Sequence, residues 1–297
     1  MIRTALSAAP SRATITTMRH TPHEADRPLA GRRRERERLV AQLDRATSGE
    51  LRVCLLAGEP GIGKTRLLRS LAREAAGRGM PALAGGASEA EGMPPFLPFL
   101  EALGGYVSTA DPAALTEQAG SGAAALAAVL PELAARLGPL PAGPSLPPEQ
   151  ARLRLFQAVA RLLTAAAEPR GLLLLLDDLQ WADPASLDLL CHLARDRPAV
   201  RVLVLGAYRA GEAAGSPLLR ALAELSRLRA LETIELGPLS EDGVAALAAA
   251  VLGAPPDPAL ARELWLQSEG NPFFAEELLR DWAERGVAAR AGDRWAL

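Results

Sequence analysis

Cysteine and histidine are scarce in this chain. Its two cysteines, Cys54 and Cys191, sit in separate apolar stretches, and it has only three histidines. These residues are too few for a disulfide framework, and their spacing matches neither a zinc site nor a hydrolase triad. We therefore exclude a small disulfide-rich domain and a zinc enzyme, and we expect a reducing, cytoplasmic setting.

Aromatic residues, net charge and long apolar runs are also limited. Aromatic residues make up 4% of the chain although hydrophobic residues make up 49%, so Leu, Ala and Val must build the core. A net charge of −2 argues against a chain that mainly grips the phosphates of nucleic acid. The longest run of large aliphatic residues, at 172–176, is far shorter than the roughly 20 residues of a membrane helix. We therefore expect no membrane partner.

A glycine-rich loop near residue 60 is the first motif with chemical meaning. It consists of Gly58, Glu59, Pro60, Gly61, Ile62, Gly63, Lys64 and Thr65, in the pattern G-x-x-x-x-G-K-T. The apolar run 51–57 before it predicts a buried strand, and residues 64–78 after it have helical spacing. Glycines let consecutive backbone N–H groups point at phosphate oxygens. We expect the loop and Arg66 to bind a nucleotide, Lys64 to contact its phosphates and Thr65 to ligate Mg²⁺.

Two adjacent acids follow the most apolar stretch of the chain. Residues 172–176 are five leucines, and Asp177 and Asp178 come directly after them. Such a run predicts a parallel strand that is buried on both faces, and ligands bind at the carboxyl ends of these strands. We expect Asp177 to hold Mg²⁺, directly or through water, and Asp178 to orient or deprotonate the attacking water.

A third apolar run, at residues 201–209, ends in Arg209. An arginine at the end of a strand beside a phosphate site can contact the γ-phosphate. Asp183 and Pro184 have the order of an N-cap and a first helical residue, so we expect Asp183 to cap a helix and not to act in catalysis.

The order of these patterns predicts the fold class. Strands and helices alternate up to about residue 238, which predicts an α/β, P-loop NTPase core at 29–238 with a parallel five-stranded sheet flanked by helices. Only helical patterns follow, so we expect a small all-helical lid at 239–285. Residues 1–28 lack hydrophobic periodicity and are expected to be disordered. The tail at 286–297 resembles the start of a hairpin.

Some elements are predicted with defined ends. The charged residues of the helix that ends near Ala46 predict a solvated, salt-bridged face. Residues 123–137 are expected to form a helical piece, and the last helix is expected to begin at Phe273 or Phe274. Ser240 is expected to cap the first helix of the lid.

Taken together, the motifs resemble a known family. They are Gly31-Arg32 with Glu35, the loop 58–65, residues 172–178 followed by Gln180-Trp181-Ala182-Asp183, residues 205–209, Gly237-Pro238-Leu239 and Gly270-Asn271-Pro272. This order resembles the STAND class of signal-transduction ATPases, and most closely the AAA-type ATPase domain of large LuxR-family transcriptional regulators. The likeness spans residues 29–297. The stretches at 177–183 and 270–274 are more specific to this family than the loop, which P-loop proteins share in general.

The resemblance implies further roles. Gly31 and Arg32 would lie against the adenine and ribose, Arg209 would sense the γ-phosphate, and Pro272 would pack on the adenine. The strand that ends in Arg209 would lie between the strand before the glycine-rich loop and the strand that ends at Asp177. The implied cofactors are ATP or ADP and Mg²⁺.

The function that the resemblance implies is an ATP-binding, slowly hydrolysing switch with weak ATPase activity. It would serve as the regulatory module of a LuxR-type transcriptional regulator, without the sensor and DNA-binding domains. Residues 286–297 would begin a truncated winged-helix-like segment, and we identify no element that reads nucleic acid. Nucleotide, self-association and regulatory proteins are the expected partners.

Two other functions stay open. A non-hydrolysing scaffold would use nucleotide only for folding, although the pair of acids at 177 and 178 argues against it. A P-loop phosphotransferase would need a basic lid, whereas residues 240–285 are largely acidic and aliphatic.

Overall fold

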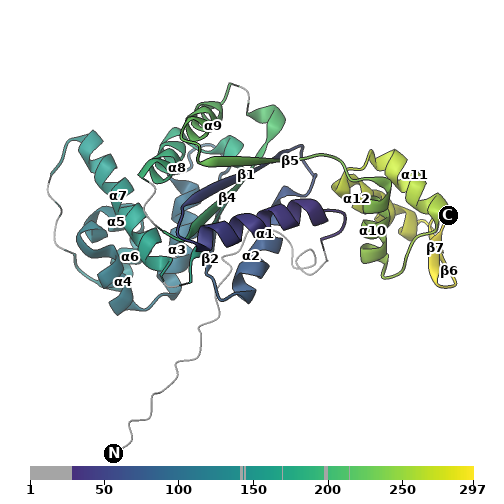
Figure 1. The fold of residues 1–297 in the computed structure, drawn as a ribbon, viewed down its shortest axis with the longest axis horizontal. Helices are drawn as coiled ribbons and strands as arrows, with labels where there is room; N and C mark the ends of the chain where they lie inside the picture. The colour runs from purple at the N-terminus through teal and green to yellow at the C-terminus, as the bar shows by residue number, and fades with distance from the viewer. Residues whose placement is uncertain (1–28, 141–142, 144, 169, 197–199, 214) are drawn as a thin grey trace, which may run out of the picture.

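In the computed structural model, the described residues are 29–140, 143, 145–168, 170–196, 200–213 and 215–297. Residues 1–28, which are expected to be disordered, lie outside the described residues. At the centre is a parallel sheet in the order β2-β3-β4-β1-β5 (Figure 1). Its strands are β1 (Arg52–Gly58), β2 (Ala82–Gly86), β3 (Leu172–Asp177), β4 (Val202–Arg209) and β5 (Leu231–Leu236). Every neighbouring pair is parallel, which confirms the expected five-stranded α/β sheet.

The order of the strands also confirms the expectation drawn from the resemblance. Strand β4 lies between β1 and β3, and Arg209 at its end is the register partner of Gly58. Because all five strands run in the same direction, the loop after β1, the acids after β3 and the arginine of β4 meet at one edge of the sheet.

Strand β3 is central because both of its faces are apolar. All six of its residues are buried, with Leu174 packed on one side of the sheet and Leu173 and Leu175 on the other. A strand that is buried on both faces needs this continuous apolar run.

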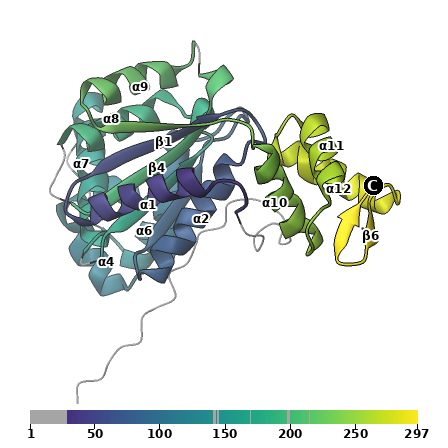
Figure 2. The ribbon, with the colours of Figure 1, turned by 45° about the vertical axis from the view of Figure 1, so that its right-hand side comes forward.

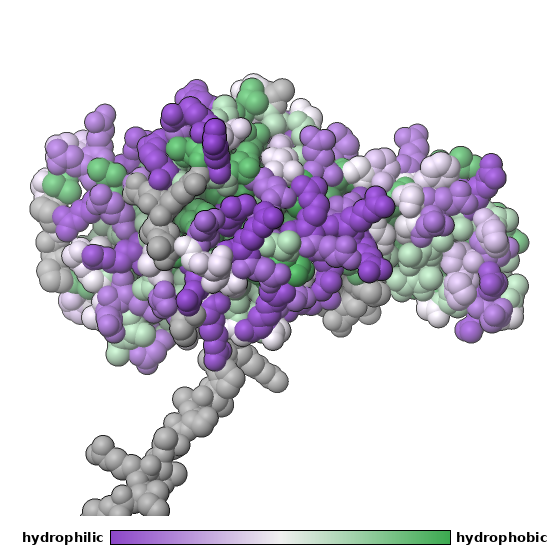
Figure 3. Space-filling model, viewed as in Figure 1, coloured by the Kyte–Doolittle hydropathy of each residue, from purple (hydrophilic) through white to green (hydrophobic). Residues whose placement is uncertain are grey.

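Helices α1 (Arg33–Thr47) and α2 (Lys64–Gly77) cover one face of the sheet (Figure 2). Leu43 of α1 and Leu67 of α2 are fully buried against it. The outward side of α1 carries exposed ion pairs, among them the pair of Arg33 and Glu37 at i,i+4 spacing. Hydrophilic residues accordingly cover the middle of the surface in Figure 3. The predicted solvated face is confirmed.

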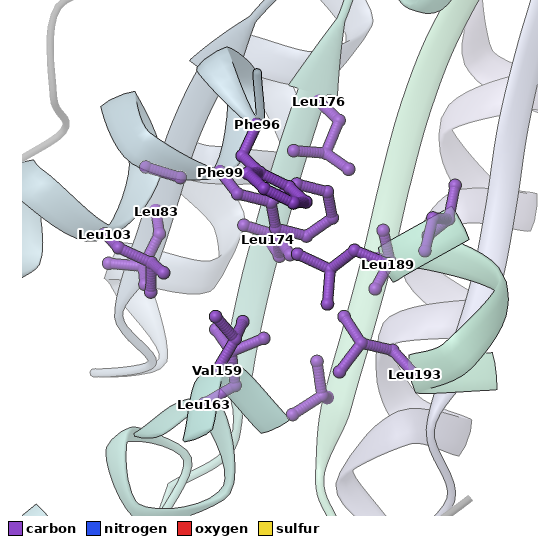
Figure 4. Packing of buried hydrophobic residues seen from close by; sticks show 14 of the residues in the cluster. Leu83, Phe96, Phe99, Leu103, Val159, Leu163, Leu174, Leu176, Leu189 and Leu193 are labelled. Atoms are coloured by element: carbon purple, nitrogen blue, oxygen red, sulfur yellow. The ribbon is translucent and has the colours of Figure 1, made fainter. Parts of the chain in front are cut away.

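Four longer helices pack on the opposite face. They are α3 (Leu97–Thr109), α7 (Pro148–Ala166), α8 (Pro184–Asp196) and α9 (Pro217–Arg227). Figure 4 shows Phe96 and Phe99 beside Leu174 and Leu176 of β3 in this layer. Phe96 also meets Phe156 edge to face, with ring centroids 6.0 Å apart. The few aromatic side chains of the protein are therefore partly concentrated here.

Three short helices lie between α3 and α7 in the chain, and they correct one expectation. They are α4 (Pro112–Ala119), α5 (Ala123–Ala127) and α6 (Pro131–Leu137). Residues 123–137 are thus two helices and not one piece. Pro131 begins the second helix, and Leu130 before it leaves the helical region with φ −121° and ψ 83°. A proline disfavours helical geometry at the preceding residue, which explains the break.

The C-terminal part is helical and has its own hydrophobic cluster. Its helices are α10 (Glu241–Leu252), α11 (Pro258–Ser268) and α12 (Pro272–Glu284). Ser240 caps α10 as expected, by accepting from the N–H of Gly243. Helix α12 begins at Pro272, earlier than expected, because the side chain of Asn271 caps it through the N–H of Phe273. The antiparallel hairpin of β6 (Ala289–Ala291) and β7 (Arg294–Ala296) follows.

The C-terminal helices lie beyond the edge strand β5 (Figures 1 and 2). The N–H of Leu239 donates to the carbonyl of Gly270, and the indole of Trp265 donates to the carbonyl of Leu239. These bonds tie the exit from β5 to the connection between α11 and α12. Among the residues described, no helix is long and apolar enough to cross a membrane.

Candidate functional site

The glycine-rich loop joins β1 to α2 and needs its glycines. Gly61 and Gly63 have φ values of +75° and +100°, a region that side chains disfavour. A Cβ atom at Gly61 would also lie 2.8 Å from the Cβ of Phe273. Gly63 is the N-cap of α2, and no side chain caps this helix. The first N–H groups of α2 can therefore bind an anion.

Lys64 folds back over the loop. Its ammonium group donates to the carbonyls of Gly58 at 2.8 Å and Glu59 at 2.9 Å, and its side chain is buried. Burial lowers the pKa of Lys64 from its ordinary value, while the carboxylates of Asp177 and Asp178 oppose this change. A cation in such surroundings gains from a phosphate that replaces neutral carbonyls as its partner.

Thr65 and Asp177 meet directly. The Thr65 hydroxyl donates to Oδ2 of Asp177 at 2.7 Å. Burial raises the pKa of the Asp177 carboxyl, the charge of Asp178 adds to this, and the hydrogen bond from Thr65 opposes it. The carboxylate is thus incompletely compensated by the protein, and a cation bound here would stabilise its charged form.

This pair fits a magnesium ion that is shared with a ligand. A hydroxyl and a carboxylate oxygen are ligands that Mg²⁺ prefers. Within the described ranges, no cluster of three or more His, Cys, Asp or Glu side chains could hold a metal by itself. The remaining ligands would therefore come from water and from phosphate oxygens, as is usual for Mg²⁺ in nucleotide sites.

Asp178 adopts an uncommon backbone conformation. Its φ of 53° and ψ of 40° lie in the left-handed region, which costs a non-glycine residue on the order of 1 kcal/mol or more. Its N–H donates to Oδ1 of Asp177 at 3.0 Å, and its own Oδ1 accepts from the amide of Gln180 at 2.9 Å. These bonds hold the carboxylate at the edge of the loop cavity.

Arg209 reaches the same cavity from β4. Its guanidinium lies over the ring of Trp181, 4.6 Å from the ring centroid, and pairs with Glu212 at 2.8 Å. Its side chain is half-buried. The strand order therefore brings Arg209 close to Lys64 and the two acids, as the resemblance implies.

The cavity around the loop has a volume of about 340 Å³, within the range of small-molecule sites. Its lining residues are Pro60, Gly61, Gly63, Lys64, Thr65, Arg66, Arg69, Asp178, Arg209, Pro272, Phe273 and Glu276. Four of them are cations and two are carboxylates. This excess of positive charge suits a phosphate group.

Three other predicted loop residues face a second cavity of about 990 Å³. Gly58, Glu59 and Ile62 line it, together with Pro238 and other residues of the junction between the sheet and the C-terminal helices. The predicted loop residues are therefore divided between the two sides of the loop.

Gly31 and Arg32 line neither cavity. The Arg32 side chain is 5% exposed and donates to the carbonyls of Ile62 at 3.1 Å and Gly237 at 2.6 Å. The α-carbon of Gly31 faces Leu239 so closely that a Cβ there would lie 2.8 Å from its side chain. Gly31 and Arg32 thus contact the loop at Ile62 and the connection after β5 at residues 237 and 239.

The start of α12 closes one side of the loop cavity. The amide of Asn271 donates to the carbonyl of Pro60 at 3.1 Å, and the N–H of Phe273 donates to Gly61 at 3.3 Å. Arg66 forms an ion pair with Glu276 of α12. Pro272 lies at this wall of the cavity.

Sequence reasoning missed several residues at this site. Arg69, Phe273 and Glu276 line the cavity. Gln180 contacts Asp178, and Trp181 contacts Arg209. Arg69 lies one helical turn after Arg66, so helical spacing could have found it. Phe273 and Glu276 reach the loop from α12, which is distant in sequence. Gln180 and Trp181 belong to the motif at 177–183, but their contacts with Arg209 join two separate strands. Asp183 behaves as predicted, because its Oδ1 caps α8 through the N–H groups of residues 185 and 186.

Comparisons with known proteins bear on this geometry. A model of the AAA ATPase domain family matches residues 28–205. A search of curated proteins gives no match. Among solved structures, a Walker-type ATPase of Pyrococcus abyssi is 14% identical with a TM-score of 0.54, and the match covers 86% of this chain and 68% of that one.

Two further solved structures match over part of their length. A RuvB mutant of Thermotoga maritima is 17% identical with a TM-score of 0.48, over 90% of this chain and 69% of that one. A STAND protein with a tetratricopeptide repeat sensor from Pyrococcus horikoshii is 14% identical with a TM-score of 0.39, over 78% of this chain and 28% of that one. The family match covers more than half of the sequence. The matched residues include the glycine-rich loop and strand β3 with Asp177. The chain belongs to the AAA ATPase domain family.

Proposed function

We propose that this chain is an ATP-binding, slowly hydrolysing switch. Membership of the AAA ATPase domain family supports a nucleotide-binding ATPase module. The observation that carries the finer proposal is the bond between Thr65 and Asp177, 2.7 Å long, beside the buried ammonium of Lys64. A hydroxyl, a carboxylate and a lysine in this arrangement serve a phosphate chain and its Mg²⁺.

Binding of the phosphates would use groups that are already placed. The uncapped start of α2 offers N–H donors, and Lys64 would exchange its two loop carbonyls for phosphate oxygens. Mg²⁺, held by Thr65 and Asp177, would neutralise charge on the phosphates. Arg66 and Arg69 on the cavity wall would add to the positive potential.

Hydrolysis would depend on Asp178 and Arg209. Asp178 lines the cavity through a carboxylate that can accept a proton from water or orient it. Arg209 can stabilise charge on the γ-phosphate, but in this structure it pairs with Glu212 and stacks on Trp181. Its release from Glu212 would have to precede that contact.

The helical part at 239–285 would act as a lid over the core at 29–238. Asn271, Phe273 and Glu276 contact the loop or the helix after it. A nucleotide that changes these contacts would change the position of α12 and thus the surface that a partner meets. In this proposal Pro272 packs on the base, and Gly31 and Arg32 support the base from the loop side.

The regulatory context rests on the motif order alone. Residues 177–183 and 270–274 resemble the ATPase module of LuxR-type transcriptional regulators, in which the hairpin β6–β7 would begin a winged-helix-like segment. Self-association or regulatory proteins would then read the state of the switch.

One set of measurements tests the function. Single-turnover assays with ATP and Mg²⁺ should show slow release of free phosphate, and limited proteolysis should give different patterns with ADP and with a non-hydrolysable ATP analogue. Tight binding without any phosphate release would favour a scaffold. Transfer of the γ-phosphate to a metabolite would favour a phosphotransferase. Identical proteolysis in both nucleotide states would contradict the switch.

A further inference from the structure

The short turn after β3 contains a buried glutamine that touches two strand ends. The 3₁₀ turn Leu179–Trp181 follows Asp178, and the side chain of Gln180 within it is 7% exposed. Its amide nitrogen donates to Oδ1 of Asp178 at 2.9 Å, and its amide oxygen accepts from the backbone N–H of Arg209 at 3.0 Å. One side chain thus joins the end of β3 to the end of β4.

The chemistry of the two partners determines how this amide is oriented. A carboxylate can only accept and a backbone N–H can only donate, so the nitrogen of Gln180 must face Asp178 and its oxygen must face Arg209. Both ends of a buried amide are therefore satisfied, which is the arrangement that makes its burial favourable. No other orientation of the amide serves both partners.

The turn itself is anchored on β4. Leu179 packs so closely on Gly206 that a Cβ there would lie 2.6 Å from its Cδ1 atom. On the other side of Gln180, the ring of Trp181 lies under the guanidinium of Arg209. The backbone of Arg209 is thus held by Gln180 and its side chain by Trp181.

We propose that Gln180 is a positioning residue that aims the Asp178 carboxylate at the loop cavity and keeps it in register with Arg209. This inference rests on the proposed ATPase function. A carboxylate held through one oxygen has a defined direction for the other, and the left-handed backbone of Asp178 needs such support. Gln180 acts through Asp178 and is not among the residues that line the loop cavity.

Two substitutions separate the two hydrogen bonds. Gln180→Glu keeps an acceptor for the N–H of Arg209 but replaces the donor to Asp178 with a like charge. Gln180→Leu removes both bonds without adding charge. The same two substitutions at Gln157, which is exposed on α7, are the matched controls.

The first readout needs no nucleotide. Hydrogen exchange of the Arg209 amide, followed by NMR in the ligand-free protein, should be at least tenfold faster in Gln180→Leu than in the wild type. In Gln180→Glu it should stay within about threefold. An Arg209 amide that is as protected in Gln180→Leu as in the wild type would show that Gln180 does not hold the end of β4.

The second readout is catalytic. Both variants should lose at least tenfold in kcat, while Gln180→Leu keeps its affinity for ADP within about threefold. A Gln180→Glu protein that keeps both its amide protection and the wild-type kcat would overturn the positioning role while leaving the proposed function intact. Wild-type protein without turnover would overturn the proposed function and the hydrolytic role of Gln180 together, and the exchange measurement would still decide the bridge.

Discussion

The hydroxyl of Thr65 donates a 2.7 Å hydrogen bond to the carboxylate of Asp177, although 112 positions separate the two residues in sequence. The first residue follows β1 and the second ends β3, with β4 between these strands. The parallel sheet brings them together because it collects the carboxyl ends of its strands at one edge.

Lys64→Ala should weaken ADP binding by about 10- to 100-fold, because a charge-assisted hydrogen bond to phosphate contributes about 1.5–3 kcal/mol. Titration calorimetry measures the affinity. Arg45→Ala is the control, since Arg45 is an exposed cation on α1 and lines neither of the two cavities beside the loop. Equal affinities in Lys64→Ala and wild-type protein would contradict the assignment of this lysine.

Asp178→Asn should keep ADP affinity within about threefold and reduce phosphate release from ATP by about 100-fold or more. The amide cannot accept a proton from water, and general-base catalysis typically contributes 10²- to 10⁴-fold. A single-turnover assay with radiolabelled ATP provides the rate. A variant that hydrolyses ATP at the wild-type rate would show that another group activates the water.

Gly61→Ala should lower the free energy of unfolding by about 1–2 kcal/mol, because φ at this position is +75° and left-handed geometry disfavours a side chain. The new methyl group would also press on Phe273 of α12. Urea denaturation measures the effect. Gly77→Ala should be neutral or slightly stabilising, because Gly77 ends α2 and has open space around it. Similar losses in both variants would argue against a special role for the backbone of Gly61.

Unfolding stability should fall as the pH rises above about 9, with Cys54 as one cause. Burial raises the pKa of the Cys54 thiol to about 12 from an ordinary value of 9.0. Between these values the unfolded chain has released the proton and the folded chain still holds it, so the unfolded state gains stability as pH rises. Between pH 8 and 10 this group should contribute a loss of about 1 kcal/mol.

Denaturant unfolding of the wild type and of Cys54→Ala at both pH values checks this prediction. The variant is expected to be less stable at pH 8 because it leaves a small cavity, so only the difference between the two pH values is compared. Cys191→Ala offers a second comparison, since burial raises the pKa of that thiol to about 11. An equal loss with pH in Cys54→Ala and wild type would exclude Cys54 as a source.

Local pattern was sufficient for much of the fold. The run of leucines at 172–176 predicted a central strand because a parallel strand that is covered on both faces is apolar along its whole length. The Asp183-Pro184 pair predicted a helix start because capping depends on neighbouring residues only. Helix ends were harder, and the break before Pro131 was missed even though proline carries its own signal.

Much of the site could not be predicted in this way. Nothing near Arg66 in sequence indicates Glu276, and nothing near Arg32 indicates Gly237. These partners lie more than 200 residues apart. Arg66 meets Glu276 because α12 returns to the loop, and Arg32 meets Gly237 because the end of β5 pairs with the end of β1. The predicted contact of Arg32 with a base stays a prediction, and the structure adds its two carbonyl partners.

The sequence by itself determined the chemistry that is available: a glycine-rich loop with a lysine and a threonine, two acids after a buried strand, and an arginine at the end of another. It did so because each motif is local and each residue type carries its own charge and hydrogen-bonding groups. Only the tertiary structure decided how these groups are held, with Gln180 between Asp178 and Arg209 and the start of α12 against the loop. The physical reason is that orientation depends on buried hydrogen bonds between strand ends and helices, which packing creates and local sequence does not record.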